Sequence, residues 1–176
     1  MNYPAAMTRL ARLDPTGVRQ LPLNHLPWIC MFHVSILGLI YGGTAAWLSR
    51  DMLLGQGLLK LTLAGIPVAF LMHAGAALFI WVFLKALGGN ASFLTAYFTL
   101  GVAAISLWPV APFLAMLQAQ SPPGPAIIIV CGITGLYGLA VTAKMIQHAF
   151  ELSFVRMVIA LSVAVLYIGC FLYLWI

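Results

Sequence analysis

Long apolar runs make up most of this chain, and short polar stretches divide it into segments. The runs are continuous and do not show the alternation of strands in a membrane β-barrel, so helices are the predicted elements. A helix needs roughly 20 apolar residues to cross a bilayer, and the runs are of that order. The pattern therefore predicts five membrane-spanning helices, over residues 28–48, 61–87, 93–117, 126–143 and 155–175.

Prolines lie inside two of these predicted helices. Pro67 lies in the second, where the missing N–H and the ring are expected to kink the helix. That helix is also longer than a straight crossing needs, so tilt or bending should take up the excess. The third helix contains the run WPVAP at 108–112, and its second half should be bent or broken.

A polar connector, KALGGNASF, separates the second and third predicted helices. Lys85 lies at the end of the second helix. Gly88 and Gly89 can adopt the left-handed conformation that ends a helix, and Ser92 is a candidate N-cap for the third helix. The sequence predicts a tight turn here.

A similar connector, KMIQHAFELSF, precedes the last predicted helix. Its polar residues include Lys144 and His148, and Ser153 is a candidate N-cap. The likeness of the two connectors is compatible with an internal repeat, but any two tight connectors would share these residue types.

The amino-acid composition indicates whether the protein is surrounded by water or by lipid. Of its 176 residues, 64% are hydrophobic and 6% are charged, whereas soluble domains have about 25% charged residues. Most of the surface must therefore face lipid. We expect an all-α integral membrane protein, with a short segment 1–27 followed by one transmembrane domain over 28–176. The net charge of +5 rests on only eight Lys and Arg residues, which excludes a nucleic-acid partner.

The distribution of the cations predicts orientation. Cytoplasmic segments of membrane proteins carry an excess of Lys and Arg, and this excess is obtained with the N-terminus inside and the C-terminus in the periplasm. Six cations then lie inside and two outside: Arg9, Arg12, Arg19, Lys85, Lys144 and Arg156 against Arg50 and Lys60. We expect the inner membrane of a bacterium, with segment 1–27 in the cytoplasm.

Small residues at helical spacing predict where helices touch. Lipid gives no hydrophobic drive for helices to associate, so close backbone approach matters more than in water. The predicted contact residues on the first, second and fourth helices are Gly38, Gly42, Gly65, Ala69, Gly135 and Gly138. Whether these faces meet within one chain, in a self-assembly or with another membrane protein stays open.

His73 is the candidate functional residue within the membrane, because an ionisable side chain near the middle of a span suggests function. Proton relay, haem ligation and metal ligation are the reactive alternatives. The other is a neutral histidine hydrogen-bonded to a carbonyl or hydroxyl group. His33 is expected one to two turns nearer the inner surface, which disfavours a two-histidine haem site. The absence of Asp and Glu from the predicted spans argues against ion-coupled transport.

Motifs for enzymatic chemistry are missing from the sequence. Cys30, Cys131 and Cys170 follow no zinc or redox spacing. The three carboxylates are scattered, and Gly88 and Gly89 follow a helix without forming a phosphate loop. We therefore expect no enzyme and no cofactor.

Two stretches resemble the Yip family of polytopic membrane proteins, in particular its short bacterial-type members. They are HAGAALFIWVFLKALGGNASFLTAYFTLGVAAISLWP and GLYGLAVTAKMIQHAFELSFVRMVIALSVAV. The shared pattern is five spans, a Gly-Gly-x-x-Ser connector and a His-x-x-x-x-Ser connector. Eukaryotic members are scaffolds that recruit Ypt/Rab GTPases through a long cytosolic N-terminal region. This chain has about 27 residues there, so Rab binding does not carry over.

The resemblance implies the fold and a non-enzymatic role. We expect an accessory or scaffold protein that packs against other integral membrane proteins or itself. One alternative is a small transporter or channel, as a single chain or as an oligomer with His73 lining the path. The other is a subunit that contacts lipid or quinone. A hydrated cavity at His73 would favour transport, and a dry His73 would favour the scaffold.

Overall fold

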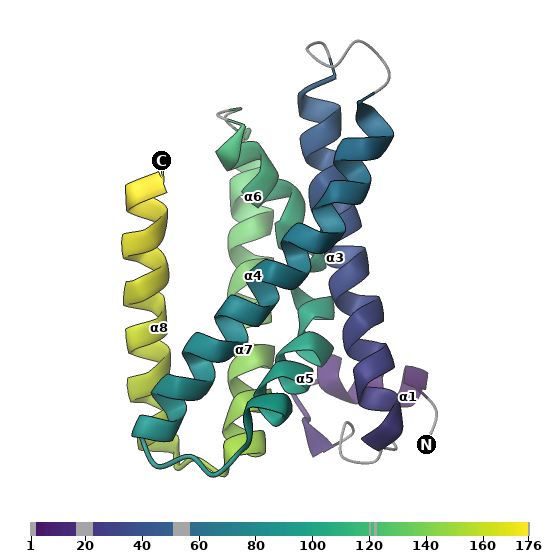
Figure 1. Cartoon of the computed structure of the whole chain (residues 1–176). Helices are drawn as coiled ribbons and strands as arrows, with labels where there is room; N and C mark the ends of the chain where they lie inside the picture. The colour runs from purple at the N-terminus through teal and green to yellow at the C-terminus, as the bar shows by residue number, and fades with distance from the viewer. Residues whose placement is uncertain (1–2, 17–22, 51–56, 120, 122, 176) are drawn as a thin grey trace.

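The described chain is helical throughout. The computed structural model describes residues 3–16, 23–50, 57–119, 121 and 123–175, and side chains are described up to 163 and at Leu166. The elements are α1 (Tyr3–Ala11), η1 (Leu23–His25), α3 (Leu26–Leu48), α4 (Leu58–Ala86), α5 (Phe93–Ala103), η2 (Ala104–Val110), α6 (Ala111–Gln118), α7 (Pro125–Phe150) and α8 (Phe154–Trp175). Figure 1 shows α3 to α7 as a bundle with α8 standing beside it.

The predicted membrane helices are present. Leu26–Leu48, Leu58–Ala86, Phe93–Gln118 and Pro125–Phe150 are long and apolar enough to cross a membrane. The apolar helix α8 is the fifth candidate. The all-helical, multi-pass class predicted from the sequence is therefore confirmed.

The third span is broken where the sequence predicted it. A 3₁₀ segment, η2, separates α5 from α6 and contains Pro109, and Pro112 follows in the first turn of α6. Pro109 lacks the N–H that a regular helix needs. In contrast, α4 continues as helix through Pro67, and Figure 1 shows it crossing the bundle obliquely, which accommodates its length.

The fourth helix is longer than the prediction of 126–143. It continues to Phe150, so Lys144 and His148 lie in the last two turns of α7 and not in a connector. The sequence MIQHAF has no helix breaker, and the helix ends only where Glu151 turns left-handed, with φ of 54°. Lys85 likewise lies in the last turn of α4.

The predicted glycines of α3 and α4 lie where the two backbones approach most closely. A Cβ at Gly65 would come within 2.1 Å of the Gly38 carbonyl oxygen, and one at Gly42 within 2.5 Å of the Thr62 carbonyl oxygen. Ala69 packs beside the buried Cys30 and Val34. This pair of helices therefore packs backbone to backbone, as small residues allow in a membrane.

On α7 the two predicted glycines differ. Gly138 packs tightly against η2, because a Cβ there would lie 2.9 Å from Leu107 Cδ2 and 3.0 Å from the Ser106 carbonyl oxygen. At Gly135 the nearest atom would be Val110 Cγ2 at 3.9 Å, an ordinary contact. The close approach is thus confined to Gly138.

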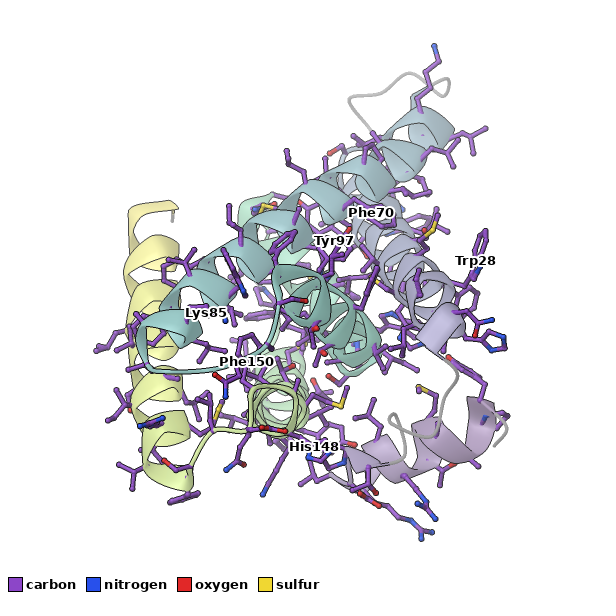
Figure 2. The ribbon with its side chains drawn as sticks, turned by 60° about the horizontal axis from the view of Figure 1, so that its bottom comes forward. Trp28, Phe70, Lys85, Tyr97, His148 and Phe150 are labelled. Atoms are coloured by element: carbon purple, nitrogen blue, oxygen red, sulfur yellow. The ribbon has the colours of Figure 1, made fainter. Side chains whose placement is uncertain are left out.

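One hydrophobic core lies at the connector end of the bundle. It joins α4, α5, α7 and α8 through Ala77, Leu84, Ala91, Ala96, Leu100, Ile146, Phe150, Leu152, Met157 and Ala160. Figure 2 looks toward this end and shows Phe150 between the end of α7 and the α4–α5 connector. The two connectors are therefore one packed unit.

The N-terminal segment packs against the bundle. Ala6 and Leu10 of α1 are buried, and Leu10 belongs to a cluster with Val102, Val141 and Met145. Arg9 and Arg12 lie on the exposed face of the segment. Arg19, used to predict orientation, lies outside the described residues.

Candidate functional site

His33 is the buried polar side chain at the centre of the described structure, with 0% of its surface exposed. Its Nδ1 lies 2.9 Å from the Val102 carbonyl oxygen, and its Nε2 lies 2.6 Å from the Tyr3 hydroxyl. A carbonyl can only accept, so Nδ1 carries the hydrogen and a neutral ring leaves Nε2 as the acceptor. Tyr3 therefore donates to His33.

Tyr3 joins α1 to α3 through this hydrogen bond. Tyr3 lies outside the membrane spans. Burial raises the pKa of its hydroxyl above the ordinary value, so the hydroxyl stays protonated and can donate the hydrogen bond. On the other side of His33, the Trp108 indole N–H donates to the His33 carbonyl oxygen at 3.0 Å. The two rings meet edge to face, with centroids 5.7 Å apart.

His73 binds to the same part of the third span. Its Nε2 donates to the Tyr97 carbonyl oxygen at 3.0 Å, and the Cys30 Sγ lies 3.8 Å from the same nitrogen. Its ring meets the Tyr97 ring edge to face at 4.5 Å. Cys30 in turn packs against Gly101, where a Cβ would lie 2.1 Å from its sulfur.

The structure places His73 beside the first turns of α3. His73 contacts Cys30, which lies three residues before His33 on α3, nearer the start of that helix. Gly38 lies against Gly65, and Cys30 lies against His73, in one antiparallel register of α3 and α4.

The resulting polar cluster is satisfied internally. We define it as Tyr3, Cys30, His33, His73 and Trp108. Both His33 nitrogens and the His73 Nε2 take part in hydrogen bonds. In the described part of the chain, no three His, Cys, Asp or Glu side chains come close enough to hold a metal ion. The hydrogen bonds and ring contacts of this cluster join α1, α3, α4 and the third span.

Sequence reasoning missed His33 as the central residue. One signal was available: Cys30, His33 and Leu37 recur at helical spacing on one face of α3. Its partners could not be inferred, because Tyr3 lies 30 and Val102 69 residues away.

Two cavities lie beside α1, and neither is lined by His33 or His73. The smaller, of about 160 Å³, is bordered by Met7 and Leu10 of α1, Ser106 of η2 and Tyr137 of α7. The Tyr137 hydroxyl donates to the Ala11 carbonyl oxygen at 2.6 Å, which attaches the end of α1 to the middle of α7.

The larger cavity, of about 390 Å³, lies between the turn after α1 and the end of α7. That turn is fixed by Asp14, whose carboxylate accepts hydrogen bonds from the Thr16 hydroxyl and backbone N–H at 2.6 and 3.0 Å. The hydroxyl hydrogen bond is the largest cause of a lowered pKa at Asp14, so the carboxylate is the stable form.

The predicted connector residues form two similar helix ends. Ser92 caps α5 by accepting from the Thr95 N–H at 3.1 Å, and Ser153 accepts from the Arg156 N–H at 3.5 Å. Gly88 has φ of 86°. Gly89 does not turn left-handed; it is needed for close contact with Phe150. Lys85 donates to the Asn90 carbonyl oxygen at 3.4 Å.

Comparison of the chain with family models, curated proteins and solved structures found no match.

Proposed function

We propose that this chain is a non-enzymatic, Yip-like scaffold of a bacterial inner membrane that packs against other integral membrane proteins. The observation that carries the proposal is the outer surface of α4 and α7. In the most apolar stretches of these helices, 6% of the α4 residues and 11% of the α7 residues are buried. Exposed apolar side chains on both helices can therefore face lipid or a partner helix.

Two glycines on this surface have no role in internal packing. A Cβ at Gly75 or at Gly132 would meet nothing within 4 Å. They lie near exposed side chains, Leu71 and Met72 on α4 and Ile133 and Leu136 on α7, each at least 60% exposed. A glycine inside a helix costs about 1 kcal/mol relative to alanine. Its use here supports close approach of another helix.

The polar cluster supports a scaffold over a transporter. A substrate path would need polar groups facing water, whereas His33 is fully buried and His73 donates to a backbone carbonyl. The cavities described above are lined by other residues. We assign both histidines to holding the helices in place.

The proposed orientation has the N-terminus in the cytoplasm and the C-terminus in the periplasm. In Figure 1, α1 and both connectors lie at one end of the bundle, and the end of α8 lies at the other. Six of the eight cations belong by sequence to the first end, which supports a cytoplasmic position for it.

Cysteine labelling tests the orientation. In a chain without the three native cysteines, Asn90→Cys should be shielded from an impermeant maleimide in intact cells, and Ser121→Cys should react. Asn90 lies in the first connector and Ser121 between α6 and α7. Reversed labelling, or labelling at both positions, would refute the arrangement.

Mild-detergent purification followed by mass spectrometry tests the scaffold. Gly75→Leu and Gly132→Leu should keep the native melting temperature, because the new side chains meet nothing inside the chain. They should lose membrane proteins that co-purify with the native chain, with Gly75→Ala and Gly132→Ala losing fewer. An unchanged set of co-purified proteins in both leucine variants would refute the proposed surface.

A further inference from the structure

The larger cavity has one polar wall and one apolar wall. The polar wall is the last two turns of α7, with Lys144, Gln147, His148 and Glu151, and the opposite wall contains Leu13 and Pro15. Figure 2 shows His148 between the end of α7 and the N-terminal segment. The hollow has a volume of about 390 Å³ and is open to the outside over much of its extent.

The charges on the polar wall have a fixed order. Lys144, His148 and Glu151 follow one another at spacings of four and three residues, so they share one face of the helix. Lys144 lies inside the helix, and Glu151 is the residue at which it ends. The rise of 1.5 Å per residue places them about 10 Å apart along the axis. The cation is therefore deeper and the anion nearer the connector end.

Two helix ends with left-handed residues border the same cavity. Among the described residues, Leu13 and Glu151 are the two non-glycine residues with positive φ, at 60° and 54°. Both line this cavity, on opposite walls. The left-handed conformation costs an ordinary residue about 1–2 kcal/mol and glycine little. Both residues follow the end of a helix: the Asp14 N–H donates to the Arg9 carbonyl oxygen after α1, and the Leu152 N–H donates to the Gln147 carbonyl oxygen after α7.

From this geometry we infer that the cavity binds the headgroup of a phospholipid that carries a primary amine, of the phosphoethanolamine type. The phosphate would lie at Lys144 and the ammonium at Glu151. In a leaflet the phosphate is the deeper of the two groups, so the lipid presents its charges in the order that α7 requires. Leu13 and Pro15 supply an apolar border for the lipid.

A headgroup with only negative charge fits this wall less well. The end of α7 presents carbonyl groups with partial negative charge, and Glu151 adds a full one. Asp14 lies near His148, whose charge contributes to the lowered pKa of the Asp14 carboxyl. Glu151 and the carbonyl end of α7 therefore favour a cation beside the anion of the headgroup. A trimethylated amine carries the same charge but has no N–H to donate to the carboxylate.

Competition in nanodiscs tests this inference on the full chain. Discs made from a phosphatidylcholine background with equal small amounts of phosphatidylethanolamine and phosphatidylglycerol would be analysed by native mass spectrometry. The native chain should retain phosphatidylethanolamine in preference to both other lipids. Equal retention of the three, or preferred retention of phosphatidylglycerol, would overturn the inference.

Two variants locate the binding site. Glu151→Gln removes the charged acceptor and should reduce the preference for phosphatidylethanolamine over phosphatidylcholine about tenfold, the value of one charge-assisted hydrogen bond. Lys144→Gln should reduce retention of all three phospholipids. Lys85→Gln is the matched control, since Lys85 lies at the same end of the bundle but outside the cavity. An undiminished preference in Glu151→Gln would overturn the assignment.

A soluble probe separates a lipid from a free metabolite. Glycerophosphoethanolamine has the same headgroup without acyl chains and should displace the retained lipid only weakly. Displacement at micromolar concentration would show a site for a soluble ligand and would overturn the lipid assignment.

Discussion

The ring of Phe150 lies directly against the backbone of Gly89. A Cβ at Gly89 would be 2.8 Å from Phe150 Cδ1 and 2.9 Å from the Leu84 carbonyl oxygen. Gly89 belongs to the connector after α4, and Phe150 ends α7. The contact therefore joins two connectors that are about sixty residues apart in the sequence.

Gly89→Ala should destabilise the protein by about 1–3 kcal/mol, the usual cost of overpacking a tight site. The Leu84 carbonyl is backbone and cannot move away as a flexible side chain would. Thermal unfolding in detergent measures the effect. Gly132→Ala is the control, because nothing lies within 4 Å of its added methyl group. Equal melting temperatures for the two variants would contradict the packing.

Neighbouring glycines of α3 provide a second comparison. A Cβ at Gly42 would lie 2.5 Å from the Thr62 carbonyl oxygen, but one at Gly43 would meet only Thr62 Cγ2 at 3.7 Å. Gly42→Ala should therefore lower the melting temperature clearly, and Gly43→Ala should leave it unchanged or raise it through better helix propensity. The opposite ranking would show that α3 and α4 do not meet on the Gly42 face.

Local signals predicted much of this fold because their causes are local. Ser92 caps a helix through a residue three positions away, and Pro109 disrupts its own helix. The extent of α7 was underestimated because hydropathy falls at Lys144, whereas the helix ends by the conformation of Glu151. Docking of α1 depends on contacts between distant residues, such as Tyr137 with Ala11, and no local pattern specifies them.

Glu151→Gly should stabilise the fold by about 1 kcal/mol. Glycine removes the left-handed penalty at φ of 54°, and its larger freedom in the unfolded state offsets part of the gain. Thermal unfolding in detergent is the measurement, with Glu151→Ala as the control that keeps the strain. A lower melting temperature for Glu151→Gly than for Glu151→Ala would contradict the left-handed conformation.

The two serine caps should differ in strength. Ser92→Ala should cost about 1 kcal/mol, the usual value of an N-cap, because its hydroxyl accepts at 3.1 Å. Ser153→Ala should cost less, since its hydrogen bond measures 3.5 Å. Ser121→Ala, outside the helices, serves as the control in thermal unfolding. Equal losses at all three serines would mean that neither residue acts as a cap.

The candidate site was harder to predict than the fold. His73 was identified because it interrupts an apolar run, and that signal needs only the sequence. Its neighbours depend on how α4 packs against α3, which brings it beside Cys30. His33 connects three helices because it forms hydrogen bonds with Tyr3 and Val102, which lie on other helices. Contacts between helices depend on how the helices pack, and the sequence of a single helix does not determine that packing.

The last prediction separates the two histidines. Glutamine can replace the single hydrogen bond that His73 donates to the Tyr97 carbonyl, so His73→Gln should fold and assemble almost as the native chain does. His33 accepts from Tyr3 and donates to Val102 on opposite sides of its ring. A glutamine cannot span both, and one buried group left unpaired costs about 1–3 kcal/mol. Tyr3→Phe removes only the Tyr3 bond and should fall between the two in melting temperature. If His73→Gln keeps native stability and the co-purifying proteins but loses the cellular phenotype, His73 performs chemistry, and the scaffold gives way to transport or ligation.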